Sequence, residues 1–377
     1  MVSTGSSGYE MLFTPIQVNE LKLENRLMMS PTHDGLADEE GFVTAEATEF
    51  YLKRALGGVG MVVIGAVDVN PRKSPHAMLS DDRFIPGWKD LVRRIHTESQ
   101  AKVCPQLIHA RKMARGWIQD VSDLPAEEVR NIVAYFEKGA IRALEAGFDA
   151  IEVHGAHGYT LAGFLSLRNK RQDEYGGTAD GRVKIIADIY EKIRAVAGSG
   201  YPVGIRINGD EFIVGGNSLQ QTRIIVRKLA AMGFDYISVS AGGKYEDSTA
   251  VHPQYGSPWP YPSSGGYSGY RAMPPATMPE AVNVYLAADL RRALRQAGYA
   301  TPVVTAGRIP HPRLADAVIR DGLADLVGLS RPLLRDPDWG TKAREGREKE
   351  IVRCTYCNEC MDRLIKNEPG LCVHLNE

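Results

Sequence analysis

The sequence predicts an α/β fold, a closed TIM-type (β/α)8 barrel with an N-terminal hairpin and a cysteine-rich C-terminal tail. Apolar runs rich in β-branched residues recur along the chain, amphipathic stretches of helical period separate them, and eight such runs lie between residues 26 and 330. Continuous apolar strands are typical of a parallel sheet buried on both faces, and alternation of strand with helix favours one parallel sheet. The alternative is an open doubly wound sheet with added elements, but such sheets usually have fewer strands.

The expected elements follow in chain order. The alternating segment Phe13–Leu23 has Asn19-Glu20 at a turn and is expected to form a hairpin that closes the N-terminal end of the barrel. Among the helices, Ala126–Ala146 has Pro125 near its start and Gly147 at its end, as helices prefer. The eight strands are expected at Arg26–Ser30, Met61–Ala66, Val103–Ile108, Ala150–His154, Val203–Ile207, Tyr236–Ser240, Val303–Ala306 and Leu326–Ser330.

A long segment, Ala241–Thr277, follows the sixth strand. It is rich in Gly, Pro, Ser and Tyr and has no apolar period. A structureless loop of this length usually has a function, so we expect it to cover the pocket. Its aromatic side chains either line that pocket or pack within the loop; they are Tyr245, Tyr255, Trp259, Tyr261, Tyr267 and Tyr270.

Composition sets the class of protein. The chain has 377 residues, of which 44% are hydrophobic, and its formal net charge is -1. Such a balance favours neither a nucleic-acid partner nor an anionic membrane surface. No apolar run reaches the ~18 residues that a spanning helix needs, and the first ten residues lack the pattern of a signal peptide, so a cytoplasmic location is expected. We predict two units, a barrel over residues 1–340 and a four-cysteine segment over residues 341–377.

The ends of the last two strands hold Gly307-Arg308 and Ser330-Arg331. In TIM-type barrels the loops after the strands carry the chemistry, and those after strands seven and eight commonly bind phosphate. Gly307 lets the backbone approach a ligand closely, and backbone N–H groups together with the Arg331 guanidinium can bind a dianion. The alternative is an ion pair between Arg331 and a carboxylate on the outer helices.

The fourth strand ends at His154, with His157 and Tyr159 in the loop that follows. Imidazoles at this position can donate to an oxygen and polarise it, and a phenol can donate a proton. The alternatives are a metal pair or histidines bonded to backbone carbonyls. A metal site needs a further ligand, and we expect Glu152 to lie on the wrong face or at the wrong depth.

Arg206 on the fifth strand is expected inside the barrel near its mouth. A buried guanidinium needs an anionic or carbonyl partner. It either forms an ion pair with a neighbour such as Asp210 or Glu211, or stabilises negative charge on a cofactor ring.

These residues carry a resemblance to the old yellow enzyme family of FMN-dependent ene reductases, in particular to the branch of 2,4-dienoyl-CoA reductase and trimethylamine dehydrogenase. The segment IEVHGAHGYTLAGFLSLRNKRQDEYGGTADGR at Ile151–Arg182 resembles the family's H-x-A-H-G-Y-L…FLSP…N-x-R-x-D-x-YGGS signature. NRLMMSP at Asn25–Pro31 and RPLLRDP at Arg331–Pro337 match in the same order. The resemblance covers about residues 10–377.

The resemblance implies a role for each matching position. His154 and His157 would bind the oxygen of an activating carbonyl, and Tyr159 would protonate the substrate after hydride transfer from the flavin. Arg206 would stabilise the anionic reduced flavin at its pyrimidine end. The other FMN contacts would be Pro31, Thr32 and His33 at the flavin border, Ala66 and Gln106 at the ring edge, and Gly307, Arg308, Ser330 and Arg331 at the phosphate.

The sequence departs from the family at three places. Leu167 stands where FLSP has proline, and HARK at His109–Lys112 replaces the commoner HAGR. No cysteine lies near His33, so the covalent flavin link of trimethylamine dehydrogenase is not expected.

Four of the five cysteines crowd the tail as Cys354-x2-Cys357-x2-Cys360-x11-Cys372. Four thiolates at short spacing can ligate a [4Fe–4S] cluster or a structural Zn²⁺, and free thiols without metal are the remaining alternative. The resemblance favours the cluster, because trimethylamine dehydrogenase-like relatives have closely similar spacing.

The resulting prediction is an FMN-dependent oxidoreductase that reduces the C=C bond of an enone or enoyl thioester, with NAD(P)H as a donor. No G-x-G-x-x-G fingerprint is present, so electrons are expected from NAD(P)H docking on FMN or from a separate electron-transfer protein. The alternatives are an amine dehydrogenase or demethylase of the trimethylamine dehydrogenase type, and an electron-transfer subunit. The oligomeric state, including a homo-oligomer, is left open.

Overall fold

Eight parallel strands close into a barrel in the computed structural model, which describes residues 8–72, 76–111, 120–243 and 266–375. Each strand pairs with the next one along the chain, and β11 pairs back with β3, which also pairs with β4. A ninth strand, β5 (Ala77–Met78), pairs in parallel with the last two residues of β4 and with no other strand of the described residues. The barrel strands are β3 (Leu27–Met29), β4 (Met61–Asp68), β6 (Lys102–Ile108), β7 (Ile151–Gly155), β8 (Val203–Asn208), β9 (Tyr236–Ser240), β10 (Val303–Ala306) and β11 (Leu326–Leu329). The predicted fold class is therefore confirmed, and the bounds of every predicted strand agree within two residues.

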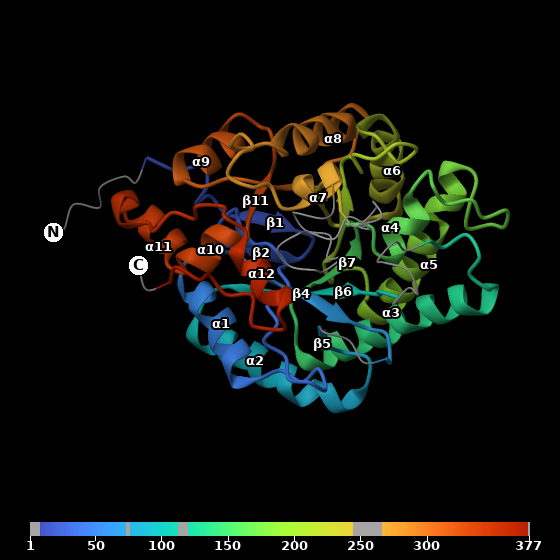
Figure 1. Cartoon of the computed structure of the whole chain (residues 1–377), viewed down its shortest axis with the longest axis horizontal. Helices are drawn as coiled ribbons and strands as arrows, with labels where there is room; N and C mark the ends of the chain where they lie inside the picture. The colour runs from blue at the N-terminus through green and yellow to red at the C-terminus, as the bar shows by residue number, and fades with distance from the viewer. Residues whose placement is uncertain (1–7, 73–75, 112–119, 244–265, 376–377) are drawn as a thin grey trace.

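Helices surround the strands on the outside (Figure 1). The predicted helix over Ala126–Ala146 is α3, with Pro125 as its N-cap and Gly147 in the left-handed conformation (φ +86°) at its end. The other helices are α1 (Ala45–Leu56), α2 (Ile85–Glu98), α4 (Thr160–Leu165), α5 (Ala179–Ala197), α6 (Leu219–Met232), α7 (Gly266–Ala272), α8 (Val284–Gln296), α9 (Pro312–Arg320), α10 (Arg331–Arg335), α11 (Trp339–Arg344) and α12 (Glu359–Ile365), with 3-10 turns η1 (Asp82–Phe84) and η2 (Glu348–Glu350). None of the described helices is long and apolar enough to cross a membrane.

One expectation about the long segment after the sixth strand was wrong. Helix α7 (Gly266–Ala272) lies within Ala241–Thr277, which had been predicted to lack structure. The sequence YSGYRA has no apolar period, and the helix is fixed instead by tertiary contacts. Ser268 is fully buried, and its hydroxyl donates to the Glu211 carbonyl at 2.6 Å. Residues 244–265 lie outside the described part of the chain.

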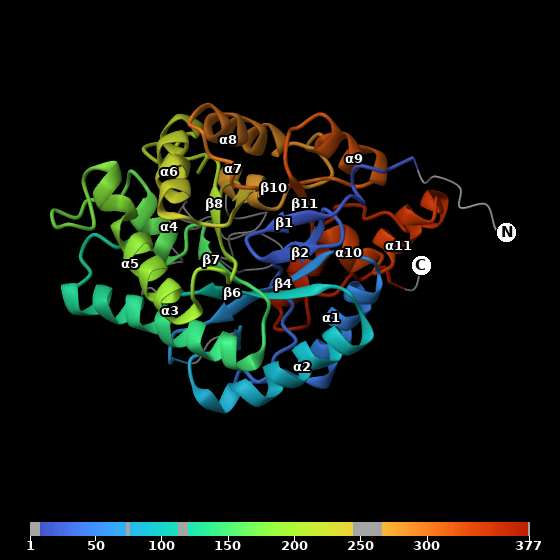
Figure 2. The ribbon, with the colours of Figure 1, turned by 180° about the vertical axis from the view of Figure 1, so that it is seen from behind.

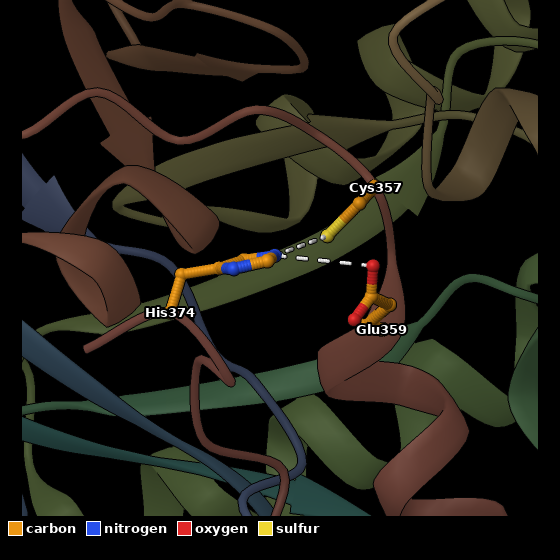
Figure 3. Close-up of side chains that lie close together, drawn as sticks. All are labelled: Cys357, Glu359 and His374. Carbon is orange, nitrogen blue, oxygen red and sulfur yellow. Dashed lines mark hydrogen bonds and ion pairs between the residues drawn. The ribbon is translucent and has the colours of Figure 1, made fainter. Parts of the chain in front are cut away.

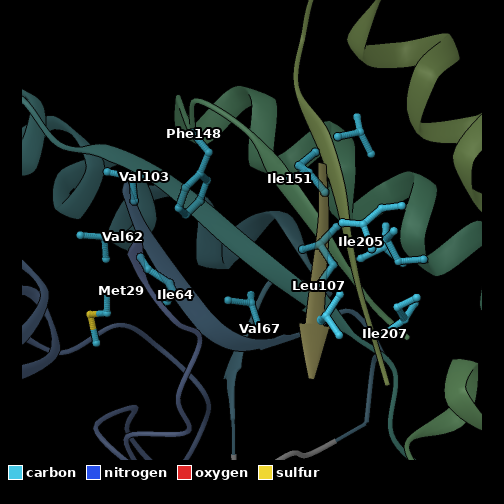
Figure 4. Packing of buried hydrophobic residues seen from close by; sticks show 14 of the residues in the cluster. Met29, Val62, Ile64, Val67, Val103, Leu107, Phe148, Ile151, Ile205 and Ile207 are labelled. Carbon is cyan, nitrogen blue, oxygen red and sulfur yellow. The ribbon is translucent and has the colours of Figure 1, made fainter. Parts of the chain in front are cut away.

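Two apolar layers follow from the alternation of side chains along each strand. Outward residues such as Val62, Leu107 and Ile205 pack against the helices (Figure 4). Inward residues at the N-terminal end of the strands form a second cluster with the hairpin. Its members are Val18, Leu23, Met28, Met61, Val63, Cys104, Ala150, Tyr236, Val304 and Leu326.

The predicted hairpin is present as β1 (Ile16–Val18) and β2 (Leu21–Leu23). In Figure 2 it lies over the centre of the ring of helices. Val18 and Leu23 are buried in the inner cluster, so the hairpin closes the N-terminal end of the barrel. The tail after α11 packs Leu371 and Cys372 against the outer core; a separate unit starting at residue 341 stays a prediction.

Candidate functional site

A pocket opens at the C-terminal ends of the strands. It encloses about 1270 Å³, part of it open to solvent. Loops after strands at opposite sides of the barrel and the tail all contribute to its lining. The lining includes every residue predicted to be catalytic or to contact the cofactor: Pro31, Thr32, His33, Ala66, Gln106, His154, His157, Tyr159, Arg206, Gly307, Arg308, Ser330 and Arg331.

Three glycines in the pocket wall lie very close to neighbouring residues. A Cβ added to Gly65 would lie 2.2 Å from Pro31 Cβ, and one added to Gly328 would lie 2.3 Å from Ser30 Oγ. A Cβ added to Gly307, which has φ +120°, would lie 2.9 Å from Asn283 Nδ2. These glycines therefore allow the segments that form the wall to pack closely together.

The floor of the pocket is a buried polar network. Gln106 Nε2 donates to Glu152 Oε1 at 2.6 Å, so the amide oxygen of Gln106 faces the opposite direction. Glu152 is fully buried; burial raises its pKa, while Arg206, Gln106 and Tyr236 lower it. Arg206 donates to Ser238 Oγ at 2.9 Å and to Ser240 Oγ at 3.3 Å.

The depth of Glu152 agrees with one of the two alternatives expected for it. Glu152 and His154 are two residues apart on β7, so their side chains lie on the same face and differ only in depth. The Glu152 carboxylate is coupled electrostatically to Arg206. Glu211 accepts hydrogen bonds from Ser166 and from the Asn217 backbone. The coupling of Glu152 to Arg206 gave no signal in the sequence, because neighbours across parallel strands are far apart in the chain.

The predicted imidazole pair lies at one side of the mouth. The ring centroids of His154 and His157 are 5.1 Å apart, and the Tyr159 ring is 5.2 Å from His154. His157 Nε2 lies 2.6 Å from Ser240 Oγ. Because Arg206 also donates to this hydroxyl, Ser240 links the imidazole to the guanidinium. The sequence analysis had not singled out Ser240, and a lone serine in a strand gives no signal of such a link.

Tyr159 is a protonated phenol at neutral pH. Burial, and after it the Asp68 carboxylate, raise its pKa well above the ordinary value. The residue stands just before α4, which fixes its backbone at the edge of the pocket. A phenol in this state can donate a proton but does not lose it to solvent.

Three of the residues predicted to bind the phosphate, Ser330, Arg308 and Arg331, have different hydrogen-bond partners. Ser330 Oγ lies 2.7 Å from Thr32 Oγ1. Arg308 Nη1 donates to the carbonyls of the 275–278 segment, at 2.9 Å for Pro275. Arg331 is 8% exposed, and its Nη1 donates to Pro274 O at 2.9 Å and to Asn358 Oδ1. The described contacts of Arg331 do not include the carboxylate of an outer helix, which was the alternative considered for it.

Several polar atoms in the pocket wall are buried without a partner in the described part of the chain. They are Ser30 Oγ, Asn283 Oδ1, Arg308 Nε and Tyr356 Oη. Buried polar groups in native proteins are almost always hydrogen-bonded to protein, water or ligand. The wall is therefore suited to a polar ligand.

His76 is a pocket residue that the sequence analysis missed. Its Nδ1 lies 2.9 Å from Nδ1 of His33, and the two rings meet edge to face at 4.3 Å. His76 is buried although it follows the end of β4 by several residues. Only the fold brings it to His33, so no spacing in the sequence could have indicated it.

The aromatic residues expected to line the pocket can be checked only in part. Tyr267 and Tyr270 are described and are not among the lining residues. Tyr267 is 54% exposed and packs against Phe212 with ring centroids 5.7 Å apart. The remaining four lie outside the described residues.

His109, which directly follows β6, is a structural histidine. Asn70 Nδ2 lies 3.2 Å from its Nε2, and Thr160 Oγ1 lies 3.0 Å from its Nδ1. An amide NH2 can only donate, so Nε2 accepts and the proton is on Nδ1. The ring is neutral, and burial lowers its pKa to about 3.

Acid should therefore destabilise the fold through His109. Its folded pKa lies below the unfolded value of about 6.5, so below that pH the unfolded chain takes up the proton first. From pH 7 to pH 5 this group should remove about 2 kcal/mol from the free energy of unfolding. Urea unfolding of His109→Asn should show that much less loss over the same pH range, and an identical loss in both proteins would contradict the assignment.

The four predicted metal-binding cysteines come together in the tail. Burial raises the pKa of Cys360 to about 12, Arg331 lowers it, and the charges of Cys354, Cys357 and Cys372 raise it. All four thiols are thus within electrostatic reach of one another. In the described residues no three of these sulfurs lie within 4.8 Å of each other, whereas donor atoms of Cys357, Glu359 and His374 do (Figure 3). His374 Nε2 is 3.9 Å from Cys357 Sγ and 3.8 Å from Glu359 Oε1.

The chain matches known proteins in sequence and in fold. Residues 11–250 and 277–350 match the NADH:flavin oxidoreductase / NADH oxidase family. The chain belongs to this family. The family is one of flavin oxidoreductases, which supports FMN as the cofactor and NAD(P)H as a reductant. The family match confirms the resemblance stated above, and an old yellow enzyme homologue from Zymomonas mobilis has the same fold, with a TM-score of 0.70 at 20% identity.

Two curated relatives illustrate the range of the family. An NADH oxidase of Thermoanaerobacter brockii is 32% identical over 92% of this chain and 52% of its own length. A cinnamate reductase of Clostridium sporogenes is 27% identical over 94% of this chain and 56% of its own length. The chain thus spans about half the length of these relatives.

Two solved structures share the fold. A 2-naphthoyl-CoA reductase in complex with 2-naphthoyl-CoA has a TM-score of 0.84 at 24% identity, over 98% of this chain and 57% of that one. Histamine dehydrogenase from Rhizobium sp. 4-9 has a TM-score of 0.80 at 23% identity, over 96% of this chain and 51% of that one. At this identity the likeness is one of fold.

Proposed function

We propose that this chain is an FMN-dependent ene reductase that reduces the C=C bond of an α,β-unsaturated carbonyl compound. The observation that carries the proposal is the meeting of His154, His157 and the protonated phenol of Tyr159 at one side of the mouth pocket. Two imidazoles can bind a carbonyl oxygen and stabilise the charge that develops on it, and the phenol can then supply a proton.

The pocket wall fits a flavin nucleotide. When bound, FMN supplies the hydride. Gln106, whose Nε2 is bonded to Glu152, would offer its amide oxygen to one end of the ring, and Arg206 would offer a positive charge there. Pro31, Thr32, His33 and Ala66 would lie along its edge, and Gly307, Arg308, Ser330 and Arg331 would hold the phosphate, all of them on the wall of this pocket.

The chain's own residues then account for the reduction. Hydride adds to Cβ of the substrate, and the π electrons of the C=C bond move toward Cα and the carbonyl oxygen. His154 and His157 hold that oxygen, which makes Cβ electrophilic and stabilises the enolate. Tyr159 gives its proton to Cα, and the saturated carbonyl compound results.

The relatives' names support this reaction class. A cinnamate reductase is among the curated relatives, and reductases of morphinone and of 2-naphthoyl-CoA are among the proteins of the same fold. Each name describes an unsaturated carbonyl compound or its thioester.

A purified, anaerobic preparation tests the proposal. Flavin absorbance near ~450 nm should be present, NADH or NADPH should bleach it, and 2-cyclohexen-1-one should restore it. Cyclohexanone, which lacks the C=C bond, is the matched control and should not. A colourless protein that takes up no FMN, or a bleached flavin that the enone does not reoxidise, would contradict the proposal; bleaching only by a reduced ferredoxin would favour an electron-transfer subunit.

A second candidate is an amine dehydrogenase, which the likeness to histamine dehydrogenase and to N,N-dimethylglycine/sarcosine dehydrogenase favours. A methylated ammonium is usually bound by an aromatic cage. Among the described lining residues the aromatic rings other than histidine are Tyr159 and Tyr356. The Tyr356 ring already contacts the guanidinium groups of Arg308 and Arg331. Bleaching of the flavin by dimethylglycine without a nicotinamide would support this function over the first.

For the tail we propose a [4Fe–4S] cluster on Cys354, Cys357, Cys360 and Cys372. Four thiolates at short spacing can hold either a [4Fe–4S] cluster or a structural Zn²⁺. The spacing of these cysteines resembles that of trimethylamine dehydrogenase-like proteins, and this resemblance supports the cluster over zinc. The cluster would exchange single electrons with the flavin or with a protein partner.

Removing one predicted ligand tests this site. Cys372→Ser should lower the iron content from about four atoms per chain to near zero, as measured by metal analysis of anaerobic protein. His374→Gln is the matched control, because it removes the other group near Cys357 and should leave the iron in place. The reverse result would instead assign a single-ion site to Cys357, Glu359 and His374. Zinc in stoichiometric amount that is lost in Cys372→Ser would show zinc on the four cysteines and contradict the cluster.

A further inference from the structure

The four-cysteine tail and the phosphate end of the mouth pocket share two side chains, Asn358 and Tyr356. Asn358 follows Cys357 directly, is 3% exposed, and accepts a hydrogen bond from Arg331 Nη1. Its Nδ2 donates in turn to Met273 O at 3.2 Å. In the described part of the chain all hydrogen bonds of the Arg331 guanidinium run from Nη1, so Nε and Nη2 remain available to an anion in the pocket.

Tyr356 is the second shared side chain. The guanidinium carbons of Arg308 and Arg331 each lie 4.8 Å from its ring centroid. Its backbone N–H donates to Cys354 Sγ at 3.3 Å, and its carbonyl accepts from Ala276. One buried residue thus contacts a predicted sulfur ligand on one side and both predicted phosphate-binding arginines on the other.

Charge couples the two sites as well. Arg331 is buried, which lowers its pKa, while Cys354, Tyr356 and Cys360 raise it. The guanidinium therefore stands between the thiols and the pocket. Met361, Leu364 and Cys360 from the same tail also line the pocket, so the tail is part of the pocket wall.

We propose that segment 354–360 forms the second wall of the FMN phosphate site, in which Asn358 and Tyr356 position Arg331. Filling the four-cysteine site then orders the arginine, and binding of the phosphate orders the cysteine segment. Because such coupling is reciprocal, each site raises the affinity of the other. The proposal rests on the function proposed above, since it takes FMN as the ligand.

The test compares FMN with riboflavin, which has the same ring and no phosphate. Asn358 has φ +67°, so glycine can replace it without backbone strain. In full-length protein freed of FMN, Asn358→Gly should raise the Kd for FMN about tenfold or more and leave the Kd for riboflavin unchanged. Asn367→Gly is the matched control, because Asn367 lies in the same tail with φ +58° but is exposed; this variant should stay within about threefold of the wild type for both flavins.

A second measurement tests the coupling itself. Removing iron from the wild-type protein with a chelator should weaken the binding of FMN and not that of riboflavin, as followed by quenching of flavin fluorescence. Equal weakening of both flavins would indicate a general structural role and overturn the proposal, and so would an unchanged FMN affinity in Asn358→Gly. A wild-type protein that binds neither flavin would overturn the proposed function instead.

Discussion

Replacing Tyr159 by phenylalanine is expected to slow the reduction of 2-cyclohexen-1-one by about 10²–10⁴-fold, the range that a positioned general acid contributes. Burial and Asp68 keep the phenol protonated, and the ring stands 5.2 Å from His154 at the mouth of the pocket. The phenylalanine keeps the ring and removes only the transferable proton. Stopped-flow absorbance of the reduced protein mixed with the enone measures this half-reaction directly.

The other half-reaction provides the internal control. Reduction of the flavin by NADH or NADPH needs no proton from Tyr159, so its rate should not change in Tyr159→Phe. Tyr175→Phe removes a phenol that is bonded to Asp188 at 2.9 Å and lies outside the pocket lining, and it should leave both rates as in the wild type. Equal rates of enone reduction in Tyr159→Phe and wild type would show that another group or water gives the proton.

The double variant His154→Ala, His157→Ala should lower the rate of enone reduction by about 10²–10³-fold for each donor lost. Both rings line the mouth pocket, and His157 is held by Ser240, which Arg206 also contacts. Removing the pair leaves the carbonyl oxygen without its donors while the flavin contacts remain. The rate constant for flavin reoxidation by saturating enone measures the effect.

A third histidine, His109, provides the control for this result. His109 is buried beside the pocket but outside its lining, so His109→Asn at neutral pH should leave enone reduction unchanged. The Kd for FMN should also be unchanged in the double variant. Undiminished turnover of the double variant would reject the role proposed for the pair.

Much of the fold could be predicted because its determinants are local. Each barrel strand is a short apolar run whose two faces are both buried, and the hairpin shows strict alternation around Asn19-Glu20. Helix α3 (Ala126–Ala146) begins after a proline and ends at a glycine, and its bounds were predicted without error. Helix α7 could not be predicted, because its burial against Glu211 is a contact between distant segments.

The candidate site was predictable to the extent that it lies at strand ends. Residues such as Gln106, Arg206 and Arg331 reach the pocket because parallel strands all end at one side of the barrel. What could not be predicted are contacts between strands and loops. The positions of His76 against His33 and of Ser240 against His157 depend on lateral packing that no spacing in the sequence encodes.

In the tail, too, part of the site could be predicted from the sequence and part could not. Four closely spaced cysteines indicate a metal site from the sequence alone, yet nothing in their spacing relates them to the phosphate end of the pocket. That relation depends on Asn358 and Tyr356, which look like spacer residues between ligands. Only the structure shows that they contact Arg331.

The hairpin β1–β2 has a consequence for the order of events in catalysis. Val18 and Leu23 fill the N-terminal end of the barrel with apolar side chains. The proposed function therefore implies that a nicotinamide and an enone both reach the flavin through the mouth pocket and bind there one after the other. We expect the oxidised nicotinamide to leave before the enone binds. Initial-rate plots against one reactant at several concentrations of the other should accordingly give parallel lines.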